Sequence, residues 1–249
     1  MKNQILTVIV SILFTQTATA QSFSINTDGS TANAAAILDV KSTAKGFLPP
    51  RMTKAQRDAI TTPAAGLVIY NITSSGLEYY NGTSWNATAH YIGESYGGGI
   101  VYFVYDGGQH GLIASSADQS TGVQWYNGVN RFTGSGGDGL NAGSMNTAMI
   151  VAGQMTDNQA GSFAAKLCAD YSVNVGGILY GDWYLPSINE LLLLYQQKVV
   201  VGGFTGVAYW SSTEYPTLNF DADYMDFSAG FTNVNTKSSP LYVRAIRSF

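Results

Sequence analysis

Apolar residues along this chain occur in short runs that glycine, proline and polar turn residues interrupt, a pattern that predicts many strands and few helices. In the first third of the chain these runs lie at 36–40, 66–70 and 77–80. Asn81-Gly82 follows the third run and predicts a β-hairpin with a two-residue turn. Thr53 and Gln56 have the spacing of a capping box, which predicts a short helix that ends near Ile60.

The pattern changes after about Tyr91. Strand-like runs come first, helix-like runs second and further strand-like runs last: 100–105 and 111–114, then 146–154, 162–170 and 187–198, then 208–213, 224–227 and 241–247. This order predicts an α+β fold rather than a parallel α/β fold. Ser187 and Glu190 form a capping box at the start of the third helix, so we assign Glu190 to helix capping rather than to a binding site.

The first 20 residues have the composition of a secretory signal peptide. Lys2 precedes an apolar run from Ile5 to Phe14, and residues 18–20 form an Ala-Thr-Ala cleavage site. We therefore expect residues 1–20 to be removed on export and the protein to be secreted or held at the cell surface. The alternative is a buried N-terminal core helix. No later apolar run is long enough to predict a transmembrane segment.

Composition and charge narrow the function classes. The chain has 12 Lys and Arg against 16 Asp and Glu, which argues against a nucleic-acid binder that relies on phosphate contacts. Its single cysteine, Cys168, excludes an internal disulfide framework, and we expect a buried thiol. Residues 21–90 contain five basic and four acidic residues, whereas residues 91–249 contain six basic and twelve acidic residues, a net charge of −6.

These differences predict a β-rich stalk or oligomerisation module at 21–90, followed by an α+β domain at 91–249. The first module has few large apolar residues for its length, so it cannot bury a full core alone. Self-association would supply the missing burial.

Seven motifs spread over residues 93–249 carry a family resemblance: Gly98–Val104, Gln109–Ala114, Ala117–Gly122, Asp182–Leu191, Tyr209–Glu214, Asp226–Gly230 and Tyr242–Arg247. Together they resemble the Lcl C-terminal-like domain family of bacterial surface proteins. The resemblance implies a C-type-lectin-like α+β domain whose N- and C-terminal strands pair. It also extends to formylglycine-generating enzymes, but their chemistry needs a pair of cysteines, and this chain has one.

A second resemblance covers residues 24–86 of the N-terminal module. Its motifs are Ile37–Val40, Lys45–Thr53, Gln56-Arg57, Gly66–Asn71 and Tyr80–Trp85. They are similar to a module found at the head of many bacterial surface and fibre-like proteins. The resemblance implies a stalk that self-associates, and we expect a trimer.

Aromatic residues are the main candidates for ligand contact: Trp125, Tyr126, Trp183 and Trp210. An indole offers a flat apolar face to a sugar and an N–H donor to a hydroxyl group. Trp183 and Trp210 lie in the family motifs, which favours core packing for them. Trp125 and Tyr126 lie between two glycines in a predicted loop, where core packing and an exposed platform are both open.

Oxygen-bearing side chains gather in one short stretch: Asn219, Asp221, Asp223 and Asp226. Calcium prefers six to eight oxygen ligands, so these residues form a candidate calcium site. The alternative is an acidic, solvated sheet edge. The Glu-Pro-Asn and Gln-Pro-Asp tripeptides of calcium-dependent lectins are missing from the sequence, and we expect no other cofactor.

Arg244 and Arg247 lie on opposite faces of the last predicted strand. We expect one of them to be buried against a carboxylate such as Glu214 or Asp182 and to stabilise the fold. No arrangement of serine, cysteine and histidine predicts catalysis, so we expect no enzymatic activity.

The combined pattern predicts an exported bacterial surface or secreted recognition protein of the adhesin type, with a glycan as the leading ligand and a surface protein as the other. The alternative is a structural component of a fibre or envelope assembly that binds no small ligand.

Overall fold

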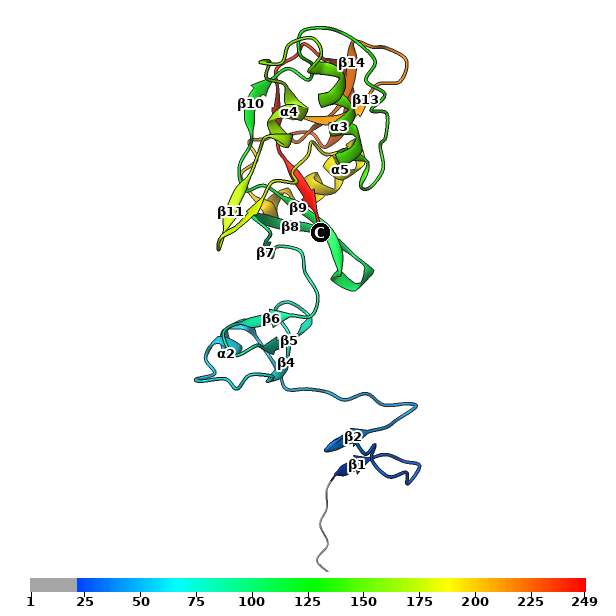
Figure 1. The fold of residues 1–249 in the computed structure, drawn as a ribbon, viewed down its shortest axis with the longest axis vertical. Helices are drawn as coiled ribbons and strands as arrows, with labels where there is room; N and C mark the ends of the chain where they lie inside the picture. Colours follow the sequence, from blue (N-terminus) through cyan, green and yellow to red (C-terminus); the bar gives the residue numbers. More distant parts are fainter. Residues whose placement is uncertain (1–21) are drawn as a thin grey trace, which may run out of the picture.

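The computed structural model describes residues 22–249, which fold into short strands and a few helices (Figure 1). The predicted signal peptide, residues 1–20, lies outside the described residues. Two small sheets lie near the N-terminal end, and a larger part with helices and strands contains the C-terminus. Within residues 22–249, no helix is both long enough and apolar enough to cross a bilayer.

The N-terminal part has seven short elements: β1 (Phe23–Ile25), β2 (Leu38–Val40), β3 (Arg51–Met52), α2 (Lys54–Asp58), β4 (Val68–Asn71), β5 (Gly76–Tyr80) and β6 (Trp85–Ala87). β1 and β2 pair in parallel, and β3, β4, β5 and β6 form a second sheet in that order. Thr53 caps α2 and Gln56 completes the capping box, as predicted. The predicted two-residue Asn-Gly turn is wrong. The loop has four residues, because the Asn81 side chain accepts hydrogen bonds from the N–H groups of Thr83 and Ser84.

The C-terminal part begins with strands, continues with helices and ends with strands. Its elements are β7 (Ser95–Tyr96), β8 (Gly99–Tyr105), a 3₁₀ turn (Asp106–Gly108), β9 (His110–Ala114), β10 (Ser120–Val123), α3 (Ala142–Gln154), α4 (Ala164–Ala169), β11 (Val173–Val175), β12 (Ile178–Tyr180), α5 (Ile188–Gln196), α6 (Lys198–Val201), β13 (Ala208–Glu214), β14 (Asp221–Asp226), β15 (Phe231–Thr236), β16 (Leu241–Val243) and β17 (Ile246–Ser248). The strands form sheets β17-β9-β8-β7 and β10-β16-β13-β14-β15, and β11 pairs with β12. This mixture of helices and strands agrees with the predicted α+β class.

The strand predicted at 241–247 is in fact two strands in different sheets. β16 pairs with β10 and β13, whereas β17 pairs antiparallel with β9. Arg244 lies at the crossing, where its guanidinium donates to Asp118 (2.7 Å) and to the carbonyls of Ser115 and Gly203. These partners come from the loops that follow β9 and α6, so this one side chain ties the two sheets together. The last strand thus shares a sheet with β7 and β8, the first strands of this part.

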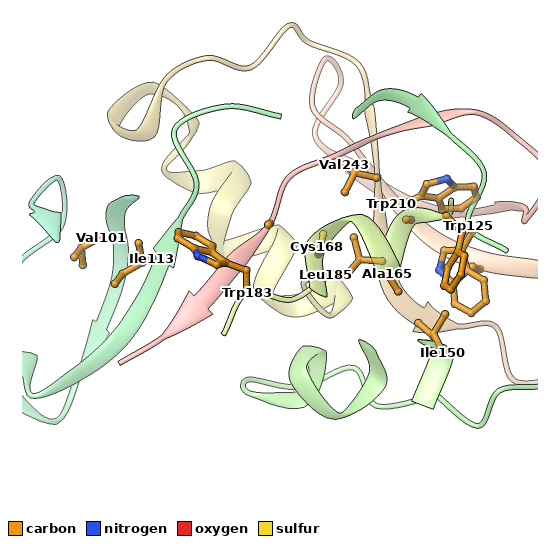
Figure 2. Close-up of a cluster of buried hydrophobic side chains, with 14 residues drawn as sticks. Val101, Ile113, Trp125, Ile150, Ala165, Cys168, Trp183, Leu185, Trp210 and Val243 are labelled. Atoms are coloured by element: carbon orange, nitrogen blue, oxygen red, sulfur yellow. The ribbon is translucent and has the colours of Figure 1, made fainter. Parts of the chain in front are cut away.

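Large aromatic and aliphatic side chains fill the interior of the C-terminal part. Figure 2 shows Trp125 and Trp210 beside each other near Ile150, while Trp183 lies closer to Ile113. Cys168 is fully buried in the same cluster, as predicted, and burial raises the pKa of its thiol well above the ordinary value. The thiol therefore packs as a small apolar group.

A buried ion pair closes one end of this core. Lys237 has no exposed surface, and its Nζ donates to Glu214 (2.5 Å) and to the carbonyls of Arg131 (3.0 Å) and Asn219 (2.7 Å). Glu214 is 3% exposed and also accepts hydrogen bonds from the backbone of residues 133 and 134. Because every proton of the ammonium group has an acceptor, the desolvation of both charges is compensated.

This network predicts a large cost for removing one partner. We expect Lys237→Ala to lower the free energy of unfolding by about 3–5 kcal/mol, because it leaves the Glu214 carboxylate buried without a counter-ion. Urea denaturation followed by tryptophan fluorescence measures the change. Lys166→Ala is the matched control, since Lys166 pairs with Asp170 on the helix surface and should cost about 0.5 kcal/mol or less. Equal effects of the two substitutions would contradict the prediction.

Candidate functional site

The β4–β5 ladder turns an apolar surface toward solvent. Val68 pairs with Tyr79 and Tyr70 pairs with Leu77, so these four side chains share one side of the sheet, which we call the outer face. Val68, Leu77 and Tyr79 are 44%, 42% and 41% exposed. A contiguous apolar surface of this kind typically marks a contact with another molecule.

The opposite side of the same ladder is buried and mostly polar. Glu78 is 3% exposed and accepts hydrogen bonds from Arg57 (2.5 Å), Asn71 (2.9 Å) and Ser74 (3.1 Å). Between residues 22 and 96 of the described chain, Ile69 is the one large apolar side chain that is buried. Apart from Ile69, the sheet therefore buries polar groups and exposes apolar ones, which reverses the usual arrangement.

The β1–β2 pair repeats this reversal. Its exposed side chains are apolar: Phe23, Ile25, Leu38 and Val40. Ser24 and Asp39 alternate with them and are half-buried. Two consecutive small sheets thus present apolar side chains away from their own chain.

The predicted aromatic platform is not available to a ligand. Trp125 is fully buried, and its indole N–H donates to the carbonyl of Ser211 (2.8 Å). Trp210 is also fully buried and Trp183 is 3% exposed. Tyr126 is half-buried and packs against the same cluster. Of the two alternatives left open for Trp125 and Tyr126, the structure shows core packing, because the indole of Trp125 binds β13 and Tyr126 packs against the same cluster.

The predicted calcium ligands do not come together. They are spread along β14 and the loop before it: Asn219, Asp221, Asp223 and Asp226. Asp226 accepts hydrogen bonds from the N–H groups of Ser228 and Ala229 in the turn after β14, while the backbone carbonyl of Asn219 binds Lys237. No group of three or more His, Cys, Asp or Glu side chains within residues 22–249 could hold a metal ion. Among the described residues these carboxylates do not form a metal-binding cluster, which favours the alternative of an acidic sheet edge.

Asp223 lines a shallow depression of about 360 Å³. The other lining residues are Ile188, Tyr215, Thr232, Asn233 and Val234. Burial, and then the charge of nearby Asp138, raise the pKa of Asp223 to about 6. A carboxyl, an amide, a hydroxyl and a phenol ring side by side can exchange hydrogen bonds with a polyhydroxylated ligand.

Three of the residues predicted to stabilise the fold make the contacts expected of them: Ser187, Glu190 and Arg247. Ser187 and Glu190 form both halves of the capping box of α5, and burial raises the pKa of Glu190. Arg247 binds Asp182, which is one of the two carboxylates predicted. Its Nε donates to Asp182 Oδ1 at 2.7 Å.

Arg244 and Glu214 have different partners from those predicted. Arg244 binds Asp118, and Glu214 binds Lys237. No local pattern predicted Asp118 or Lys237 as partners, since each is 23 or more residues from the residue it binds.

Two family models match this chain. A family model described as the Lcl C-terminal domain matches residues 115–247. The chain belongs to the Lcl C-terminal domain family. A second model, described as a phage tail like trimerisation region, matches residues 24–132, which include both sheets with reversed polarity. This match supports self-association and a surface or fibre-like protein. No curated protein matches the chain.

The raised pKa of Asp223 predicts a pH effect on stability. The folded chain binds this proton more tightly than the unfolded chain, whose carboxyl has a pKa near 3.8, so stability falls as pH rises from about 4 to above 6. We expect Asp223→Asn to raise stability at pH 7.5 by at most about 1 kcal/mol, or roughly 2–4 °C in Tm, after solvent screening is counted. The difference should disappear at pH 4.

Asp226→Asn is the matched control because the pKa of Asp226 is shifted in the opposite direction to that of Asp223. Hydrogen bonds from Ser228 and Ala229 lower the pKa of Asp226, so its contribution to stability is present at neutral pH and lost as pH falls below about 3.8. This variant should be less stable than the parent at pH 7.5. Thermal melts by circular dichroism at several pH values test both signs, and a gain from Asp223→Asn that persists at pH 4 would refute the assignment.

Proposed function

We propose that this protein is an exported, non-catalytic surface or fibre-like protein. In this proposal, three chains associate through the outer face and display three Lcl C-terminal domains to an extracellular ligand. The observation that carries the proposal is the reversed polarity of the β4–β5 sheet, in which Glu78 is buried and Leu77 and Tyr79 are exposed. The match to a trimerisation region over these residues supports a trimer.

The charge distribution supports the same division of roles. Residues 22–90 carry a net charge of +1, whereas residues 91–249 carry −6. Copies of the N-terminal part can approach one another with little repulsion. Three C-terminal domains repel one another and are better separated than packed together.

For the displayed domain we propose recognition of a neutral glycan. The depression beside Asp223 supports this ligand class, because it combines several hydrogen-bonding side chains with the phenol ring of Tyr215. The net charge of −6 disfavours sulfated or otherwise polyanionic glycans. The C-type-lectin-like fold is part of this proposal, supported by the sheet that joins the first strands of the domain to its last strand. The competing function is a structural part of a fibre or envelope assembly.

The first prediction concerns the assembly. We expect the exported chain to have the mass of a trimer by size-exclusion chromatography with light scattering. Val68→Lys/Leu77→Lys should produce monomers, because each subunit would bury two unpaired charges in the interface. Val199→Lys is the control: Val199 is 89% exposed on α6, far along the chain from the outer face, and its substitution should leave the trimer intact. A parent chain that is monomeric at all concentrations would refute the proposal.

The second prediction concerns the ligand. We expect the trimer to bind neutral glycans on an array that also carries sulfated glycans, with equal signal in calcium and in chelator. Asp223→Ala should reduce the signal about tenfold or more, since a hydrogen bond to a charged group contributes roughly 1.5–3 kcal/mol. Asp226→Ala is the control. A trimer that binds nothing on the array favours the structural alternative.

A further inference from the structure

Residues 22–68 contain regular strands and no buried side chain. The most exposed apolar groups lie at the beginning of this stretch, where Phe23 is 64%, Ile37 is 80% and Phe47 is 70% exposed. Figure 1 shows the β1–β2 pair connected to the β3–β6 sheet by an extended chain that covers neither sheet. Nothing within the described chain therefore shields the β1–β2 pair from water.

In a single chain, residues 22–50 lack the apolar burial that would keep them folded. Ordering the backbone costs about 1–2 kcal/mol per residue, and burial of apolar surface is the main compensation. An isolated pair of short strands is at best marginally stable in water, and it needs further strands or a packed hydrophobic face to become stable. Residues 22–50 have the ordering cost without the burial, so the missing compensation has to come from another molecule.

The polar side of the β1–β2 pair is already satisfied within the chain. Ser24 Oγ donates to the carbonyl of Ser30 (3.3 Å), and Asp39 accepts from the N–H of Asn33 (2.8 Å). The polar loop between the strands thus occupies one side. The other side carries Phe23, Ile25, Leu38 and Val40 and is the side left for a partner.

Two observations identify the partner as another copy of this chain. Residues 22–50 contain Asp28, Asp39, Lys41 and Lys45, a net charge of zero, so copies of the segment can pack together without repulsion. The match to a trimerisation region spans residues 24–132, so one family model covers both the β1–β2 pair and the outer face of the β4–β5 sheet. The two reversed sheets are then parts of one interface.

We propose that residues 22–50 fold only when they pack against the same segments of two other copies. This inference rests on the proposed trimer and adds a step to it: folding of the β1–β2 pair and association of the chains are one event. The segment stays unfolded in the monomer and contributes its apolar face to a core shared by three chains.

Hydrogen–deuterium exchange on the full exported chain tests the coupling. In the trimer, amides in the β1–β2 ladder should exchange on the order of 100-fold more slowly than in an unfolded chain. In the Val68→Lys/Leu77→Lys monomer the same amides should exchange at the unfolded rate, although no residue of the segment has been changed. The amides of β8 and β9, which lie in the C-terminal core, should remain protected in both samples and report that the rest of the chain is folded.

A second variant tests the segment itself. Phe23→Ser/Leu38→Ser should weaken the trimer by about 100-fold or more in dissociation constant, since two large apolar side chains per subunit lose their burial. Val199→Ser should leave the dissociation constant unchanged, although Val199 is 89% exposed in the single chain, more than Phe23 or Leu38. Analytical ultracentrifugation over a dilution series measures both.

Other outcomes separate this inference from the proposed function. A trimer in which residues 22–50 exchange at the unfolded rate would overturn the coupling and leave the trimer standing. A segment that is equally protected in the monomer would also overturn it. A parent chain that never associates would overturn both the coupled folding and the proposed trimer.

Discussion

The placement of apolar side chains on the outward sides of two small sheets governs the N-terminal part of this protein. In β1–β2 and again in β4–β5, polar groups face the chain's own loops and apolar groups face away. A chain with this polarity has no interior of its own over residues 22–68. Its strands have regular hydrogen-bond ladders, but a hydrophobic core has to be completed by other copies.

The C-terminal part, in contrast, buries a hydrophobic core within one chain. Its aromatic residues are buried, and its longest basic side chains are buried with them: Lys237, Arg244 and Arg247. Each of these residues is paired with a carboxylate, and Arg244 and Lys237 also bind backbone carbonyls from distant loops. Such pairs contribute little net stability compared with apolar contacts, but an arrangement of the loops that separated the partners would leave a buried charge unpaired. They therefore define how the loops of this part sit on its sheets.

The two parts suit different tasks for physical reasons. The nearly neutral N-terminal part can be brought together in several copies, and the acidic C-terminal part resists close packing with itself. The hydrogen-bonding groups near Asp223 lie on β14, β15 and the adjoining loops of the C-terminal part. The proposed ligand site and the apolar outer face of the β4–β5 sheet are therefore built from different residues.

Several features of this protein could be derived from the sequence alone, because they depend on residues close together in the chain. Both capping boxes are of this kind, since Thr53 with Gln56 and Ser187 with Glu190 interact over three residues. The order of strands and helices, the burial of Cys168 and the family motifs were equally accessible. So was the shortage of large apolar residues in the N-terminal part, which already predicted self-association.

Other features were decided by contacts between residues far apart in the sequence. A loop position suggested exposure for Trp125, but β13 supplies a carbonyl for its indole from 86 residues away. A continuous apolar run suggested one final strand, but the Arg244–Asp118 pair holds the chain where it passes from one sheet to the other. Alternation within β4 and β5 showed that each strand has two sides. Only the packing of Arg57 against Glu78 decided that the apolar side faces outward, because a buried carboxylate needs a cation that lies 21 residues away in the sequence.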